Sequence, residues 1–243
     1  MNQTAEILTL QESTCKRIRE MITRGDIASG QRIKESQLAR MLGSSRVPVR
    51  ESLIRLKAEG LVANKPHCGF MVKEYTRKDI IELYQLREVI EGLAASLAAE
   101  NGTDQQILEC KKLHEEFKVL VSKHEDLPED QKEQAMAIRE QICTVDEKLH
   151  MLILSMSGNS RLESVFSSIL AQRRLCLSLA AVHEERLQEH NFANRLSIKS
   201  HEKVIFGIEN HASVLAEKEM RDHVAGALHG LLRHMEKIVK LLQ

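Results

Sequence analysis

The chain has 243 residues, and its 35 Lys and Arg are balanced by 35 Asp and Glu. Hydrophobic residues make up 42%, enough for a folded core, whereas 3 prolines and 11 glycines are too few for the many tight turns of a β-sandwich or β-barrel. No apolar run reaches the ~18 residues of a membrane-spanning helix, and the N-terminus lacks the basic start and apolar core of a secretion signal.

The balanced charge hides a difference between the two ends of the chain. Residues 1–75 carry 13 Lys and Arg against 8 Asp and Glu, whereas residues 76–243 carry 22 against 27. A basic first part favours binding to a polyanion, and the acidic remainder favours another partner. We therefore expect two domains, over residues 1–75 and 76–243.

Helical periodicity predicts a first helix over residues 11–24 and a second, shorter helix soon after it. Ser36 is placed to cap the second helix, and Gly43 is placed to end it in the left-handed conformation. The residues expected on the buried side of the second helix are Leu38, Met41 and Leu42.

A third helix is predicted over residues 46–59, with an N-cap at residues 44–45 and a stop at Gly60. The residues of its buried stripe are Val49, Leu53 and Leu56. Two helices joined by a tight turn, after a longer first helix, are typical of a helix-turn-helix. Residues 61–65 and 69–73 then predict a two-stranded hairpin, the wing of such a module.

Arg46 and Arg50 are four residues apart, so they share a face near the N-terminal end of the third helix. That end of a recognition helix meets base edges in the major groove, where an arginine can bond guanine bidentately. The alternative is that the two arginines form a solvated helix face. The three helices, the turn, the wing and the positive charge together favour DNA binding.

The run from Ser45 to Leu53, Ser-Arg-Val-Pro-Val-Arg-Glu-Ser-Leu, is followed by Glu59-Gly60-Leu61-Val62 and a glycine-bearing wing. This pattern resembles the winged helix-turn-helix of the GntR family of bacterial transcriptional regulators over about residues 11–73. The resemblance implies binding to double-stranded operator DNA. The residues it assigns to DNA contact are Ser36, Ser45, Arg46, Val47, Arg50 and Gly69. At Ser36, relatives often carry a basic residue that this chain lacks.

From Thr76 onward the sequence shows helical periodicity only, which predicts an all-helical bundle of six or seven helices. The candidate helices are 77–100, 104–123, 130–157, 160–185, 190–211 and 213–241. A polar loop is expected around residues 124–130. The fold is therefore mainly α, with a winged helix-turn-helix followed by a helical bundle.

Ionisable residues lie on the apolar stripes of three of these helices. They are Asp146 and His150, four residues apart, then His201 and His223. Burying a polar group without a partner costs roughly 2–7 kcal/mol, so these residues should meet one another, a buried water or a metal. Three imidazoles and one carboxylate suit a divalent ion such as zinc, nickel or manganese. The alternative for each histidine, and for others such as His114, is an ordinary structural residue.

An Asp-x-x-x-His followed by one histidine on each of two later helices resembles the FCD effector domain of one GntR subfamily. Residues 83–91 and 157–162 resemble that subfamily too, and the likeness covers residues 78–238. It implies that Asp146, His150, His201 and His223 hold a divalent metal, to which a small organic acid can bind. Arg87 matches an arginine of the effector cavity, and the alternative for it is an internal salt bridge with a glutamate.

The sequence therefore predicts a homodimeric regulator that is not an enzyme. Five scattered cysteines without a Cys-x-x-Cys pair fit a reducing cytoplasm. One alternative is a metal-dependent, hydrolase-like enzyme, because such a site can activate water. The sequence has no His-Glu-x-x-His or nucleophile motif to support it. The other alternative is a binding protein whose metal is purely structural.

Overall fold

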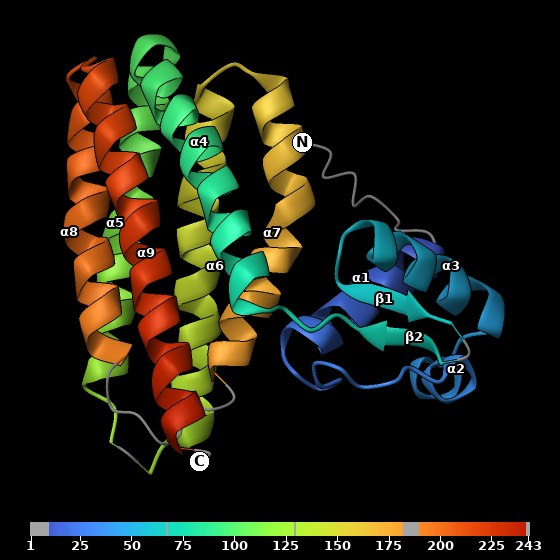
Figure 1. Cartoon of the computed structure of the whole chain (residues 1–243). Helices are drawn as coiled ribbons and strands as arrows, with labels where there is room; N and C mark the ends of the chain where they lie inside the picture. The colour runs from blue at the N-terminus through green and yellow to red at the C-terminus, as the bar shows by residue number, and fades with distance from the viewer. Residues whose placement is uncertain (1–9, 67, 129, 182–189, 242–243) are drawn as a thin grey trace, which may run out of the picture. The chain divides into compact units, whose positions relative to one another are not determined.

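The computed structural model describes residues 10–66, 68–128, 130–181 and 190–241, which are mainly helical (Figure 1). The predicted combination of a winged helix-turn-helix and a helical domain is confirmed. The chain divides into two compact units. One comprises Met1–Lys78 and Ser167–Glu184, and the other comprises Asp79–Phe166 and Glu185–Gln243. No helix within the described ranges is long and apolar enough to cross a bilayer.

The first three helices of the chain, which belong to the first unit, are α1 (Leu10–Thr23), α2 (Glu35–Leu42) and α3 (Arg46–Ala58), close to their predicted bounds. The side chains that α3 buries completely are Val49, Leu53 and Leu56, as predicted. Arg19 of α1 forms two hydrogen bonds with the Glu59 carboxylate just after α3, at 2.9 and 2.8 Å. This bidentate ion pair fixes the C-terminal end of α3 against α1.

The ends of α2 and α3 show where local sequence signals succeed and fail. Gly43 ends α2 in the left-handed conformation at φ 62°, as predicted. The prediction that Ser36 caps α2 is wrong, because the helix begins at Glu35 and Lys34 takes the N-cap position. Met41 was expected on the buried side, but it is 58% exposed. Ser45 does occupy the N-cap position of α3, without a side-chain capping bond.

Strands β1 (Val62–Lys65) and β2 (Gly69–Val72) form the predicted antiparallel hairpin, with Val62 opposite Val72 and Lys65 opposite Gly69. A third segment joins the sheet, because Arg32 forms a β-bridge with Met71. Its backbone pairing continues where the Ile33 N–H donates to the Phe70 carbonyl at 2.8 Å. No strand was predicted for this segment, because a single bridge is too short to show alternation. His67, which stands between the two predicted strands in the sequence, lies outside the described residues.

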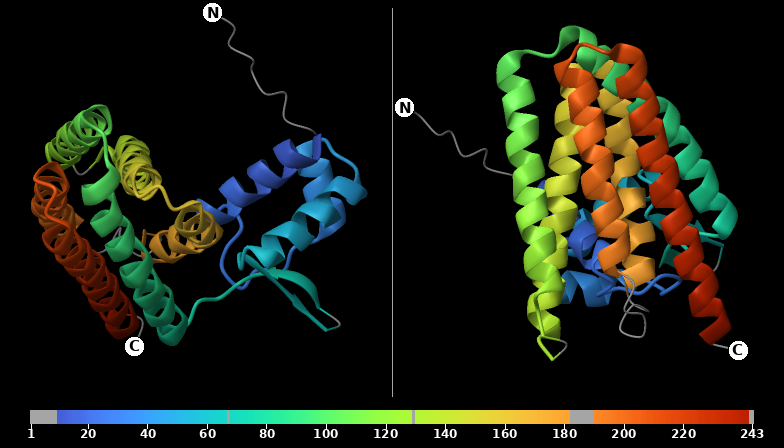
Figure 2. Two further views of the ribbon diagram at one scale, coloured as in Figure 1. Left: turned by 90° about the horizontal axis from the view of Figure 1, so that it is seen from above. Right: turned by 90° about the vertical axis from the view of Figure 1, so that its left-hand side faces the viewer.

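The helices after the wing agree with the predicted ranges to within a few residues. They are α4 (Arg77–Asn101), α5 (Asp104–Glu125), α6 (Lys132–Met156), α7 (Ser160–Ala181), α8 (His190–Glu209) and α9 (Ser213–Leu241). The predicted helix 160–185 runs beyond the described part of α7. Within the second unit, α5 lies beside α6 and α8, and α8 lies beside α9 (Figure 2).

Small residues let the helices of the second unit approach closely. The alanines of α4 that are almost completely buried are Ala94, Ala95, Ala98 and Ala99. Gly207 of α8 lies against α9, since a Cβ atom built there would be 2.8 Å from the backbone nitrogen of Ala216. A contact that short leaves no room for a side chain, so α8 and α9 meet at backbone distance.

Replacing Leu53 by Ala should destabilise the first unit by about 2–5 kcal/mol, because it removes buried methyl groups and leaves a cavity in the α3 core. Hydrogen exchange of the amides in α1 and α3 would measure the loss. The matched control is Ile54→Ala, at the neighbouring position, whose side chain is 55% exposed. Equal losses for the two variants would contradict the assigned core.

Candidate functional sites

The N-terminal end of α3 presents a row of exposed side chains. Arg46 and Arg50 are both exposed, and Val47 between them is 65% exposed. Ser45, the preceding residue, is exposed as well. The opposite side of α3 is buried against the rest of its unit, so this row of side chains is open to contact with a ligand at the N-terminal end of the helix.

Two further residues assigned to DNA contact also lie on the surface of the first unit. Gly69 begins β2 with φ 76°, in the left-handed region that favours glycine, and a Cβ atom there would meet nothing within 4 Å. Ser36 is exposed in the first turn of α2. The wing therefore offers open backbone, and Ser36 offers a hydroxyl to an incoming group.

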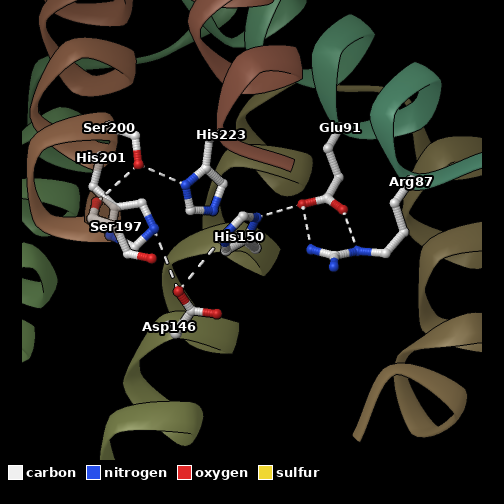
Figure 3. A network of polar contacts seen from close by, with 8 residues as sticks. All are labelled: Arg87, Glu91, Asp146, His150, Ser197, Ser200, His201 and His223. Carbon is white, nitrogen blue, oxygen red and sulfur yellow. Dashed lines mark hydrogen bonds and ion pairs between the residues drawn. The ribbon is translucent and has the colours of Figure 1, made fainter. Parts of the chain in front are cut away.

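The four residues predicted as metal ligands come together in the second unit (Figure 3). Asp146 and His150 project from α6, His201 from α8 and His223 from α9. All four are buried, and one ligating atom from each lies within 4.8 Å of the others. The ring centroids of His201 and His223 are 4.6 Å apart, and those of His150 and His223 are 5.1 Å apart. We call these four residues the Asp–His cluster.

Contacts within the Asp–His cluster converge on its carboxylate. The Oδ1 atom of Asp146 lies 3.3 Å from Nε2 of His201 and 3.8 Å from Nε2 of His150. Burial lowers the pKa of His223 well below its ordinary value, and the neighbouring His201 and His150 lower it further. His223 is therefore neutral at pH 7, the form in which an imidazole offers a lone pair.

The arrangement fits a divalent metal ion. Zn²⁺ binds nitrogen and oxygen ligands at about 2.0–2.2 Å in a tetrahedron, so its donor atoms lie about 3.3–3.6 Å apart. The donor atoms of the cluster lie within 4.8 Å of one another, so the most distant of them would move together by about 1 Å on binding. Nε2 of His150 is buried and has no hydrogen-bond partner among the residues that the structure describes. An orphaned nitrogen beside two imidazoles and a carboxylate is a suitable donor set for such an ion.

A buried ion pair adjoins the cluster on α4. Nε and Nη2 of Arg87 bond the carboxylate of Glu91 at 2.7 and 3.4 Å, and Glu91 also contacts Nδ1 of His150. Arg87 and Glu91 are each only 1% exposed. Of the two roles left open for Arg87, the geometry shows the internal salt bridge. Its third nitrogen, Nη1, is buried without a hydrogen-bond partner in the described part of the chain.

The Glu91 carboxylate is charged under ordinary conditions. Its complete burial raises the pKa, but the nearby Arg87 guanidinium and the His150 ring outweigh this effect and lower the pKa to about 2. A charged carboxylate facing an imidazole accepts the hydrogen of that ring nitrogen. Nδ1 of His150 therefore carries a hydrogen that it donates to Glu91, and Nε2 is the ring nitrogen on the side of Asp146.

Three residues around the cluster were missed by the sequence analysis as site residues. Glu91 lies four residues after Arg87, a spacing that could have identified it as the partner on the same helix face. Ser200 contacts Nδ1 of His223 at 2.7 Å, and nothing in the sequence distinguishes this serine. His114 is buried, and its ring centroid lies 6.0 Å from that of His201.

Comparison with protein families matches residues 82–226 to the FCD domain and residues 10–72 to the bacterial regulatory proteins of the gntR family. The chain is 30% identical to the uncharacterized HTH-type transcriptional regulator YdhC of Bacillus subtilis, over 71% of this chain and 74% of that protein. It is 25% identical to the Nta operon transcriptional regulator of Aminobacter aminovorans, over 88% of this chain and 87% of that protein.

Among solved structures, McbR/YncC of Escherichia coli matches with a TM-score of 0.75 and 19% sequence identity. The match covers 94% of this chain and 100% of that one. At this identity the likeness shows the fold, a winged helix-turn-helix followed by a helical domain.

Replacing Arg87 by Met should lower the free energy of unfolding of the second unit by about 3–5 kcal/mol, because the buried charge of Glu91 loses its partner. Chemical denaturation with a probe in the second unit would measure the loss. The double variant Arg87→Met/Glu91→Leu should recover part of it, since no unpaired charge then remains. The control is Arg221→Met, which breaks a half-exposed ion pair with Glu217 and should cost less than about 1 kcal/mol. If Arg221→Met lowered the free energy of unfolding as much as Arg87→Met, this would contradict the claim that burial makes the Arg87–Glu91 pair costly to break.

Proposed function

Because the chain belongs to the GntR family of bacterial transcriptional regulators and carries its FCD domain, we propose that a metal and a small organic acid control its binding to operator DNA. Its family establishes the regulatory class. The observation that carries the proposal is the Asp–His cluster, four buried ligating residues brought together from three helices. Homodimerisation is part of the proposal, since two protomers are needed to read two half-sites of an operator.

DNA reading falls to the exposed end of α3 in this proposal. Arg46 and Arg50 enter the major groove, where each guanidinium can bond a guanine or a phosphate bidentately. Val47 lies between them and gives an apolar contact to a base edge. Ser45 and Ser36 offer hydroxyls to phosphates, and Gly69 lets the wing approach the DNA backbone closely. Surface exposure of every one of these residues supports the assignment.

Metal binding falls to Asp146, His150, His201 and His223. Zinc, nickel and manganese all suit this donor set, and the histidines do not discriminate among them. When bound, the ion supplies a Lewis-acidic centre to which a carboxylate can coordinate. The residues themselves provide the lone pairs, the compensating negative charge of one carboxylate and a buried surrounding that excludes competing water.

A small carboxylate is the effector that the surroundings of the cluster favour. Nη1 of Arg87 is a buried hydrogen-bond donor without a partner in the described part of the chain, and a guanidinium bonds carboxylates well. Its other nitrogens remain on Glu91, so binding of an acid at Nη1 leaves the internal ion pair in place. The acid regulates by favouring the dimer geometry, either matched or mismatched to the operator, to which it binds more tightly.

Replacing Arg46 or Arg50 by Ala should reduce the affinity for an operator selected with the full-length chain by roughly 1–3 kcal/mol each. Titration of the labelled operator, with a scrambled sequence for comparison, would separate loss of specificity from loss of general affinity. The control is Arg55→Ala, in the last turn of the same helix, where the side chain is 60% exposed. Unchanged specificity in both test variants would overturn the assignment of α3 as the reading helix.

The unaltered chain should bind one divalent ion per protomer, and His223→Ala should abolish this stoichiometric binding because it removes one of four ligands. Elemental analysis after dialysis and calorimetric titration with Zn²⁺ would measure it. The matched control is His229→Ala, an exposed histidine on the same helix, which should leave binding unchanged. Failure of the unaltered chain to bind any of the three metals would defeat the proposal.

An effector role differs from a purely structural metal in its response to organic acids. A ligand present at 100 times its Kd stabilises the folded chain by about 2.7 kcal/mol. We expect small carboxylates to raise the Tm of the metal-loaded chain further and to change its affinity for the selected operator. Stabilisation by metal, with no response to any acid in a panel of mono-, di- and hydroxy-acids, would instead identify a structural ion.

A further inference from the structure

Two polar residues outside the Asp–His cluster each contact one histidine of the cluster at its ring nitrogen Nδ1. Glu91 of α4 contacts Nδ1 of His150, and Ser200 of α8 contacts Nδ1 of His223 at 2.7 Å (Figure 3). Both contacts cross from one helix to another, and both meet Nδ1. The other nitrogen of each ring, Nε2, is not engaged by these two contacts.

The direction of the Ser200 contact follows from its second partner. Oγ of Ser200 also lies 3.0 Å from the carbonyl oxygen of Ser197, one turn earlier in α8. A carbonyl oxygen only accepts, so the single hydroxyl hydrogen of Ser200 is donated to it. Toward His223 the hydroxyl can then only accept, and Nδ1 of that ring carries the hydrogen.

At His150 the acceptor is the carboxylate of Glu91, which accepts a hydrogen bond more strongly than a hydroxyl does. Glu91 is held in place by the Arg87 guanidinium, so its carboxylate can only accept from Nδ1 of His150. In metal sites, the ring nitrogen that binds is set by the hydrogen bond that the other nitrogen makes. Both rings are therefore prepared with the hydrogen on the nitrogen that faces away from the cluster.

We propose that Glu91 and Ser200 are positioning residues that fix the tautomers of His150 and His223, so that both rings offer Nε2 to a metal. This inference rests on the proposed metal-binding function. Without an acceptor on Nδ1, each ring would share its hydrogen between the two nitrogens and could rotate. With both acceptors in place, Nε2 of each ring is available as a ligand before a metal binds.

The experiment reads tautomer and metal affinity separately in the full-length chain. Histidine ring nitrogens labelled with ¹⁵N report by NMR which nitrogen carries hydrogen, measured without metal at a pH well above the ordinary histidine pKa of about 6.5. Competition with a chelator of known affinity reports Zn²⁺ binding. In the unaltered chain, His150 and His223 should both show hydrogen on Nδ1, and their signals should be identified by their loss in His150→Gln and His223→Gln.

Ser200→Ala should mix the tautomers of His223 and weaken Zn²⁺ binding about 10- to 100-fold. Ser200→Thr keeps a hydroxyl and should restore both measurements. The matched control is Ser197→Ala, since only the backbone carbonyl of that residue takes part. Glu91→Gln should weaken binding to an intermediate degree, because the amide oxygen still accepts while the charge is lost.

The outcomes distinguish this inference from the proposed function. Hydrogen on Nε2 of His223 in the unaltered chain would overturn the inference, whatever metal binds. Equal Zn²⁺ affinity in Ser200→Ala and the unaltered chain would also overturn it, while leaving the metal site intact. Absence of metal binding in the unaltered chain would defeat the proposed function, whereas the NMR measurement would still decide the tautomers.

Discussion

The cost of burying charge without a partner governs the arrangement of the second unit. Arg87, Glu91 and His150 form one continuous chain of contacts from α4 to α6, and both charged residues of the pair are almost wholly removed from solvent. Each of these three residues is the bonding partner of the next. Replacing one of them alone leaves a buried charged or polar group without its partner, which lowers the free energy of unfolding. This interaction keeps an arginine in the core and, at the same time, aims one ring of the Asp–His cluster.

Helices place ionisable side chains in opposite ways in the two units. In the first, α3 buries an apolar stripe and leaves its cationic end in solvent, where a polyanion can reach it. In the second, α6, α8 and α9 turn ionisable groups inward, where low polarity strengthens every electrostatic contact. Surface charge suits recognition of an extended partner, and buried charge suits the small ligand that we propose for the second unit.

Much of this architecture could be predicted from the sequence because the signals are local. Periodicity and few breakers predicted the helices, and polar residues on apolar stripes predicted the members of the Asp–His cluster that the structure brings together. Other features depend on which helices become neighbours. The contact of Glu91 with His150 joins α4 to α6, and that of Ser200 with His223 joins α8 to α9. Local patterns carry no such information, just as the exposure of Met41 could not be deduced from its spacing.

Gly207 links the spacing of α8 and α9 to the geometry of the Asp–His cluster. Gly207 lets α8 approach α9 at backbone distance, and the same two helices carry His201 and His223. A methyl group at this position, about two helical turns from the rings, would spread the helices and widen the gap between two donor atoms. A wider gap between donor atoms fits ions with longer coordination bonds. For the metal ion that we propose, a residue that never touches the ion would then influence which radius the site accepts.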